Sequence, residues 1–271
     1  MNNYTSAEAD TRGTHMNLFQ AAQPWEYRWR IAILFLSQPV LAAIYYFWNG
    51  SQGVWYAPPI DPTYGFIATL LAGCGLAIRI WGTSFLTAEV VTGLTARNDR
   101  LVVGGPFAAI RNPLYVGTLL IFAGFGMFFG PVFAAIFVAV HWLRYGRVIR
   151  YEEGFLKQEW GAQFDAYCKT VPRWWPNSIS RQHFAGPFAT IDGILGNGVF
   201  FGMFLGYSAS VWYGTLEPLV HFEALGWMVS GIALLRTRYL GDQVEAPLPD
   251  LTAGMQLAAQ ESPAGQSRHA G

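Results

Sequence analysis

The stretch LYVGTLLIFAGFGMFFGPVFAAIFVAVHWL, from Leu114 to Leu143, contains no charged residue and is divided in the middle by Gly130-Pro131. A helix needs about 20 predominantly apolar residues to cross the hydrocarbon core of a bilayer, and fewer when its polar ends reach the headgroups. Gly and Pro interrupt helices and mark the turns between them. The stretch therefore predicts two helices that lie in a membrane as a tight hairpin.

Four more apolar runs lie outside this hairpin, and together they predict an all-α, polytopic transmembrane bundle of about six helices. The runs are Ile31–Trp48, about Tyr64–Leu86, about Gly196–Tyr213 and Leu219–Leu235. The composition agrees, because 52% of the 271 residues are hydrophobic, only 13% are charged and the mean hydropathy is +0.25. Soluble domains carry about 25% charged residues. The 11 Trp, 13 Tyr and 20 Phe are typical of chains with aromatic belts at the membrane surface.

Charge and cysteine content exclude several other classes of protein. Lys and Arg total 17, as do Asp and Glu, so the net charge gives no sign of a nucleic-acid partner. Cys74 and Cys168 are far apart and belong to no cluster with ligand spacing, so we expect neither a disulfide framework nor a metal site. The polar N-terminus lacks the basic and apolar pattern of a signal peptide, so we expect the first span to direct membrane insertion.

Basic residues outside the spans predict the orientation of the chain. They precede the first span, lie between the second and third, and follow the fourth and sixth, whereas the loop at 49–63 and the loop between the last two spans contain none. Cytoplasmic loops are enriched in Lys and Arg. We therefore expect both termini in the cytoplasm and a bacterial inner membrane as the location. Arg144, Arg147 and Arg150, spaced by three, predict that the fourth span continues as a helix into the headgroup region.

The apolar runs also divide the chain into four parts. Residues 1–25 form a polar N-terminal segment, 26–182 the membrane core and 183–240 an additional pair of transmembrane helices. The tail at 241–271 is rich in Ala, Gly, Pro, Ser and Gln, a composition typical of disorder. No internal repeat is visible in the sequence.

The segment GPFAAIRNPLYVG, Gly105 to Gly117, places an arginine directly in front of the hairpin. Asn112 and Pro113 have the pattern of a helix start, because Asn is a favoured N-cap and Pro is best tolerated at the first helical position. A helix N-terminus offers free N–H groups and a partial positive charge, to which Arg111 adds a full charge. Together they would bind a carboxylate or phosphate. The simpler interpretation is a plain helix cap with Arg111 reaching a lipid phosphate.

Three further features carry ionisable or aromatic side chains. Glu152 and Glu153 are adjacent and do not share a helix face, so they either form salt bridges with residues such as Arg147 and Arg150 or supply a counter-charge for a cationic ligand. Arg79 lies inside the second span, where an ionisable group is costly and faces a partner or cavity unless it reaches the interface. A group of aromatic residues precedes and follows Arg173, where it lines a pocket or forms an interfacial belt: Phe164, Tyr167, Trp174 and Trp175.

In combination, these stretches resemble the isoprenylcysteine carboxyl methyltransferase and phospholipid methyltransferase family of integral membrane enzymes. That family pairs G-P-[YF]…R-[HN]-P-x-Y-x-G with E-E-x-x-L…[FW]-G…Y…V-P-R…P, the second motif following a helical hairpin. Here the two motifs read GPFAAIRNPLYVG and EEGFLKQEWGAQFDAYCKTVPRWWP. The likeness covers about Gly73 to Pro176, and the order and spacing of two separate motifs make it specific.

The resemblance implies an enzyme that binds S-adenosylmethionine in a cytoplasmic pocket and methylates a lipophilic or small apolar acceptor from the bilayer. The acceptors that it leaves open are a prenylcysteine-like carboxylate, a phospholipid amine and a thiol. The resemblance implies catalytic roles for Arg111, Glu152 and Glu153. It also implies a set of cofactor-binding residues: Gly105, Pro106, Arg111, Asn112, Pro113, Tyr115, Glu153, Tyr167 and Arg173.

The chemistry of these residues agrees with that implication, with one departure from the family pattern. The helix start and Arg111 suit the carboxylate of S-adenosylmethionine, a Glu suits its cationic groups, and aromatic faces suit its adenine or sulfonium. Many family members have His where this chain has Asn112, and Asn cannot titrate near neutrality. A different class of function, a membrane transporter or a non-catalytic scaffold, stays open, in which Arg79 would line a substrate path.

Overall fold

The computed structural model describes residues 20–48, 60–86, 101–176 and 189–240. Within these ranges the regular secondary structure consists only of helices, so the all-α class is confirmed. The predicted tail and most of the predicted N-terminal segment lie outside the described residues. In chain order the helices are α1 (Pro24–Arg28), α2 (Arg30–Trp48), α3 (Pro62–Phe85), α5 (Pro106–Ala109), α6 (Pro113–Met127), α7 (Pro131–Thr170), α8 (Ile191–Leu195), α9 (Gly198–Tyr213) and α10 (Glu217–Leu240).

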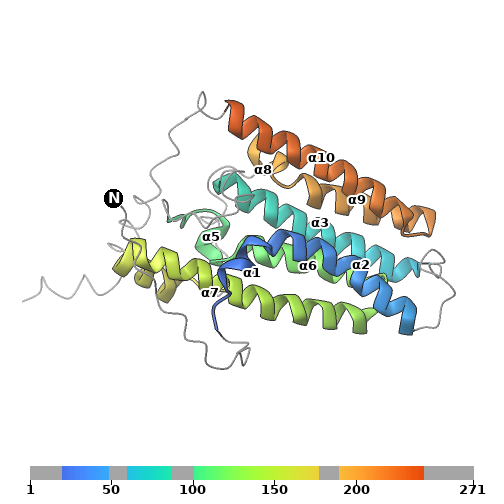
Figure 1. Ribbon diagram of the computed structural model, residues 1–271, viewed down its shortest axis with the longest axis horizontal. Coiled ribbons are helices and arrows are strands. Elements are labelled where there is room, and N and C mark those ends of the chain that lie inside the picture. The colour runs from blue at the N-terminus through green and yellow to red at the C-terminus, as the bar shows by residue number, and fades with distance from the viewer. Residues whose placement is uncertain (1–19, 49–59, 87–100, 177–188, 241–271) are drawn as a thin grey trace, which may run out of the picture.

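Six of these helices are long, and they run side by side in a bundle at the positions that the apolar runs predict (Figure 1). The predicted hairpin is present as α6 and α7, which meet at Gly130 with a φ of +106°. This left-handed region is open to glycine at no steric cost, which explains why the turn falls there. The helix of the fourth span also continues far beyond the apolar run, as the basic periodicity predicts, because α7 contains 40 residues.

Three helices are by themselves long and apolar enough to cross a membrane: α2, α3 and α7. Helix α6 is apolar but has only 15 residues, and the crossing of α9 and α10 stays a prediction from the sequence. Large apolar side chains cover the outside of the bundle, where they would meet lipid rather than water. They include Leu36, Val40, Phe66, Leu70, Ile136, Val140, Trp212, Met228 and Ile232. The chain is therefore a membrane protein.

Glycines bring α3 and α6 into direct backbone contact at the centre of the bundle. A Cβ atom on Gly75 would lie 2.4 Å from the carbonyl oxygen of Gly117, and one on Gly117 would lie 2.6 Å from that of Gly75. Small residues at such crossings are how membrane helices gain packing energy, since lipid chains give no hydrophobic drive for association. The crossing fixes the start of α6 relative to α3.

Replacing Gly117 by Ala is expected to destabilise the protein by about 1–3 kcal/mol, because the new methyl group must push two backbones apart. Gly154 on α7 is the matched control, since a Cβ there meets nothing within 4 Å. Ala at Gly154 is expected to be neutral or to stabilise by up to about 1 kcal/mol through helix propensity. Thermal unfolding of both variants in lipid nanodiscs measures the difference, and equal stabilities would contradict the described crossing.

Arg79 joins α3 to α6 and to α9 through neutral acceptors. The side chain is 6% exposed, and its Nε donates to Oδ1 of Asn197 at 2.9 Å. Its Nη1 donates to the Leu114 carbonyl at 3.1 Å and to Oγ1 of Thr118 at 2.7 Å. Asn197 is fully buried and also donates to Oγ1 of Thr83 on α3. Arg79 therefore faces a partner, and the partner comes from the additional helix pair, which docks on the core through this network.

Candidate functional site

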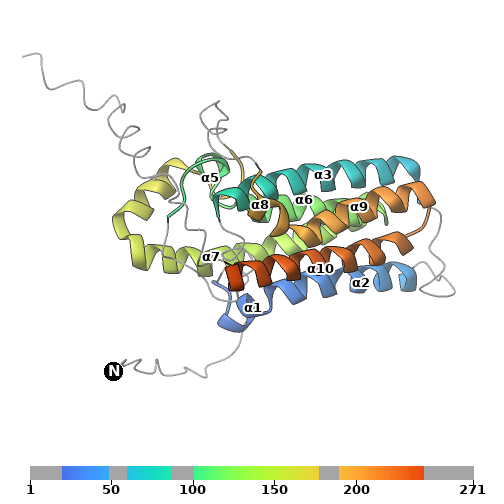
Figure 2. The same cartoon turned by 90° about the horizontal axis from the view of Figure 1, so that it is seen from above.

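Helix α7 extends past the end of the bundle and then turns back on itself (Figure 2). The turn lies at Gly161, where φ is +45° and ψ is −117°, so the helix is interrupted there. A non-glycine residue would be strained at this position. The returning segment carries Tyr167 and ends at Thr170, and the chain then passes along residues 105–113. The two motifs of the sequence are brought together by this return.

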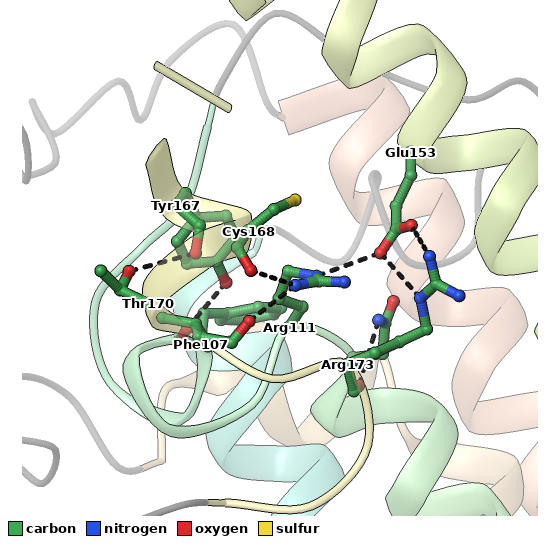
Figure 3. A network of polar contacts seen from close by, with 9 residues as sticks. Phe107, Arg111, Glu153, Tyr167, Cys168, Thr170 and Arg173 are labelled. Atoms are coloured by element: carbon green, nitrogen blue, oxygen red, sulfur yellow. Dashed lines mark hydrogen bonds and ion pairs between the residues drawn. The ribbon is translucent and has the colours of Figure 1, made fainter. Parts of the chain in front are cut away.

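Arg111 holds the end of α7 in place. Its Nη1 donates to the carbonyls of Cys168 at 3.0 Å and Val171 at 2.6 Å, and its Nε lies 3.1 Å from Oε1 of Glu153 (Figure 3). The backbone N–H of Arg111 donates to the carbonyl of Pro172 at 2.9 Å. The last carbonyls of a helix have no partner within the helix, so a guanidinium is well suited to satisfy them. Much of the hydrogen-bonding capacity of Arg111 is thus used inside the protein.

Glu153 lies between two arginines. Beside Arg111, it accepts from Arg173, whose Nη2 is 2.5 Å from Oε2 and whose Nε is 3.3 Å from Oε1 (Figure 3). The Glu153 side chain is 14% exposed. Arg147, which the sequence suggested as a salt-bridge partner for Glu152 or Glu153, pairs instead with Glu26. Glu153 therefore joins the two motifs as a shared counter-charge.

Asn112 occupies the predicted N-cap position of α6, and Pro113 is the first helical residue. The side chain of Asn112 makes no capping hydrogen bond. Its Nδ2 instead donates to the carbonyl of Arg173 at 3.3 Å. The helix start is confirmed and side-chain capping is wrong, because the amide group turns toward the returning segment rather than toward the first turn of α6.

The remaining residues of the first motif support the same junction. Gly105 has a φ of +59°, and a Cβ there would lie 2.4 Å from the ring of Phe85, so only glycine fits. Pro106 is buried at the start of α5. The hydroxyl of Tyr167 donates to the carbonyl of Phe107 at 2.7 Å, which ties α5 to the returning part of α7 (Figure 3). These three residues shape the loop in front of α6.

Glu152 points to the other side of α7 and forms a second polar cluster. The hydroxyl of Tyr115 on α6 donates to its Oε1 at 2.8 Å, and Tyr27 on α1 lies close enough to act electrostatically on this carboxylate. The guanidinium of Arg30 lies 4.0 Å from the centre of the Tyr27 ring and acts electrostatically on Glu152. As expected for adjacent helical residues, the two carboxylates do not form a pair. Glu152 and Tyr115 line one cluster, and Arg111, Glu153 and Arg173 form the other.

Helix α1 is a part of the site that the sequence interpretation missed. Glu26 accepts from Nη2 of Arg147 at 2.7 Å and from its Nε at 3.1 Å, and the N–H of Ala22 donates to the Arg147 carbonyl at 2.9 Å. The hydrogen bond with Arg147 lowers the pKa of Glu26 below its ordinary value. The stabilisation from this pair is therefore present above the unfolded-state pKa and is lost as the pH falls through the lowered one. The run PWEYRWR, with its mixed aromatic and charged residues, was the available signal.

The described residues contain no group of three or more His, Cys, Asp or Glu side chains that would hold a metal ion. Of the aromatic group near Arg173, Phe164 packs with Tyr167 and Val171, whereas Trp175 is 73% exposed. Trp174 lies beside Trp142 with a ring separation of 6.1 Å. These side chains do not converge on one pocket.

Comparison with known proteins gives a family match for the centre of the chain. Residues 64–163 match the family model described as phospholipid methyltransferase. The chain is 30% identical over 149 residues to the cobalt-zinc-cadmium resistance protein CzcN of Cupriavidus metallidurans, covering 55% of this chain and 62% of the relative. It is 36% identical over 76 residues to protein-S-isoprenylcysteine O-methyltransferase B of Arabidopsis thaliana, covering 28% of this chain and 39% of the relative. The chain thus spans less than two thirds of either relative, and no solved structure matches it.

Proposed function

Residues 64–163 match the family model described as phospholipid methyltransferase, and from that premise we propose that the chain is an S-adenosylmethionine-dependent membrane methyltransferase. Its acceptor is a lipophilic or small apolar molecule that reaches the site from the bilayer. The observation that carries the proposal is Glu152, a carboxylate that accepts from the Tyr115 hydroxyl at the end of the bundle where both motifs meet.

The described residues fit the charges of the cofactor. S-adenosylmethionine carries a carboxylate and an ammonium group, and its sulfonium supplies an electrophilic methyl group when bound. Glu152 is suited to a cationic group, because it is a carboxylate whose orientation is fixed by the hydroxyl of Tyr115. The N-terminus of α6 and Arg111 are suited to the carboxylate.

Arg111 is suited to this role only in part. Its Nε and Nη1 are bonded to Glu153 and to the carbonyls at the end of α7, while among the described residues its Nη2 has no hydrogen-bond partner. The Nη2 group of Arg111, with two N–H donors, therefore remains for an anionic ligand. Glu153 and Arg173 act by positioning that group, and Gly105, Pro106, Asn112, Pro113 and Tyr167 by shaping the loop around it. This division refines the catalytic and cofactor roles that the family resemblance implies.

The acceptor determines what else Glu152 must do. A carboxylate acceptor is already a nucleophile and needs no base, whereas an ammonium or a thiol must first lose a proton. For those acceptors Glu152 is the proton acceptor that lies next to the site. We propose the cytoplasmic side for this chemistry, with both termini in the cytoplasm and a bacterial inner membrane as the location, because the basic residues favour that orientation.

Replacing Glu152 by Gln is expected to weaken S-adenosylmethionine binding by about 10- to 100-fold, since a charge-assisted contact with a cation is worth about 1.5–3 kcal/mol. The measurement is equilibrium binding of radiolabelled S-adenosylmethionine to the purified protein in nanodiscs. Glu159→Gln, an exposed position on the same helix, is the matched control and should bind as the wild type does.

Two results would count against the proposal. Normal binding by Glu152→Gln would remove the carboxylate from the site, and no binding by the wild type would favour the transporter or scaffold interpretation. Methyl transfer into membrane extracts, followed by identification of the labelled product, then names the acceptor.

A further inference from the structure

One side of α7 inside the bundle carries polar groups that no protein group satisfies. Both ring nitrogens of His141, the hydroxyl of Tyr145 and Nη1 of Arg144 are buried without a hydrogen-bond partner. His141 and Tyr145 are each only 2% exposed. Buried polar groups are nearly always paired, because an unpaired one keeps the full cost of losing water. Three such residues within five positions of one helix require an explanation.

The three residues belong to one face of α7, because positions 144 and 145 follow position 141 by three and four residues. The ring of His141 is 4.6 Å from those of Phe122 and Phe137, so its surroundings are otherwise apolar. Arg144 lies over the Tyr145 ring at 5.5 Å, and its Nη2 donates to the Arg30 carbonyl at 2.8 Å. These three residues, His141, Arg144 and Tyr145, are called the donor cluster below.

The donor cluster continues into the proposed methyl-transfer site. The ring of Tyr145 lies 4.8 Å from that of Tyr115, whose hydroxyl reaches Glu152. Glu152 itself lies seven residues after Tyr145, which is two turns along the same face of α7. A ligand held by the cluster would therefore extend toward Tyr115 and Glu152.

The electrostatic surroundings of the cluster are positive. Arg144, Arg79 and Arg30 all act on the hydroxyl of Tyr145. The hydrogen-bond acceptors of Arg79 are an amide, a hydroxyl and a carbonyl, and the acceptor of Arg144 is a carbonyl. In the described part of the chain, neither Arg79 nor Arg144 forms an ion pair. Glu152 faces Arg30, and Glu26, which also acts on Arg144, is paired with Arg147.

We propose that the donor cluster binds the oxyanion of the lipophilic methyl acceptor, a carboxylate or a phosphate. Arg144 and Tyr145 each supply an N–H or O–H donor, and His141 supplies one N–H in its neutral form. An ammonium group is rejected, because it would meet unpaired donors and nearby arginine side chains at the same place. The oxyanion site itself does not depend on the proposed function; only the identification of its ligand as the methyl acceptor rests on it.

The test is equilibrium binding of three radiolabelled probes to the full-length protein in nanodiscs of zwitterionic lipid. Dodecanoate carries a carboxylate, dodecyl phosphate a phosphate and dodecylamine a cation on the same chain. We expect at least one of the two anions to bind and the amine to bind at least 10-fold more weakly. Dodecanoate binding alone would identify a carboxylate acceptor, and preferential binding of dodecyl phosphate a phosphate ligand. Equal binding of all three would overturn the proposal.

Two variants separate ligand binding from a structural role. Tyr145→Phe removes a hydroxyl that has no protein partner, so we expect an unchanged or higher melting temperature together with about 10-fold weaker anion binding. Arg144→Gln is expected to weaken anion binding more strongly than Tyr145→Phe. Val140→Ala, on the lipid-facing side of the same turn, is the control and should bind as the wild type does. Wild-type anion affinity in Tyr145→Phe and Arg144→Gln would overturn the proposal.

Binding of S-adenosylmethionine, measured in the same preparations, distinguishes the two hypotheses. Both variants are expected to retain it within about threefold, since neither residue belongs to the cofactor site. Cofactor binding without anion binding would refute the donor cluster alone. Anion binding without cofactor binding would refute the proposed function and leave the cluster as an oxyanion site.

Discussion

Replacing Glu153 by Gln is expected to weaken S-adenosylmethionine binding by about 100-fold and to destabilise the protein by about 2–3 kcal/mol. Without the carboxylate, the guanidinium groups of Arg111 and Arg173 face each other with no counter-charge. The expected loss of stability is smaller than the 3–5 kcal/mol typical of breaking a fully buried ion pair, because the Arg173 side chain is 32% exposed. The affinity for S-adenosylmethionine falls because the Nη2 group of Arg111, with its two N–H donors, is no longer held in place.

The matched control is an exposed ion pair within α7, between Lys157 and Asp165 at 3.1 Å. Their side chains are 64% and 49% exposed, so Lys157→Ala is expected to change stability by less than about 0.5 kcal/mol. Radioligand binding and thermal unfolding measure both effects. If Glu153→Gln behaved like the control, the junction between the two motifs would have no role in the site.

Replacing Asn197 by Leu is expected to destabilise the protein by about 3–5 kcal/mol, because it leaves the buried Arg79 without its acceptor on α9. The double variant Arg79→Met/Asn197→Leu is expected to recover most of this loss. In it Thr118 keeps its own bond to the Leu114 carbonyl, at 2.8 Å, and the site of the charge becomes apolar. A double-mutant cycle from thermal unfolding in nanodiscs isolates the coupling.

The coupling between Arg79 and Asn197 also tests the contribution of the helices beyond the family match. Additive effects of the two substitutions would show that Asn197 does not stabilise Arg79 and that α9 docks without a contribution from this guanidinium. A strong coupling would make the additional helix pair a structural requirement for the start of α6.

The helices followed from the sequence because their signals are local. Apolar runs of membrane length and the Gly130-Pro131 turn place the starts of the six long helices within a few residues of the observed ones, whereas α7 ends at Thr170, far beyond its apolar run. The start of α6 was equally clear, since Asn112 and Pro113 prefer those positions irrespective of the rest of the fold.

The polar contacts did not follow from the sequence, because they join residues that are far apart along the chain. Arg111 bonds to carbonyls 57 and 60 residues later, and no pattern around Arg111 specifies them. The turn at Gly161 decides which residues return to the first motif. Tyr27 lies outside the family resemblance, so neither periodicity nor motif connected it with Glu152.

The sequence separation of the Arg79 contacts has a consequence for the order of events during biosynthesis. The chain elongates at about 5–20 residues per second, and Asn197 follows Arg79 by 118 residues. For roughly 6–24 seconds, Arg79 therefore lies in the nascent chain without its amide partner. Thr118 and the Leu114 carbonyl emerge much earlier, 39 and 35 residues after Arg79. The first half of the bundle can thus shelter this guanidinium while the ribosome is still making the helices that complete its hydrogen bonding.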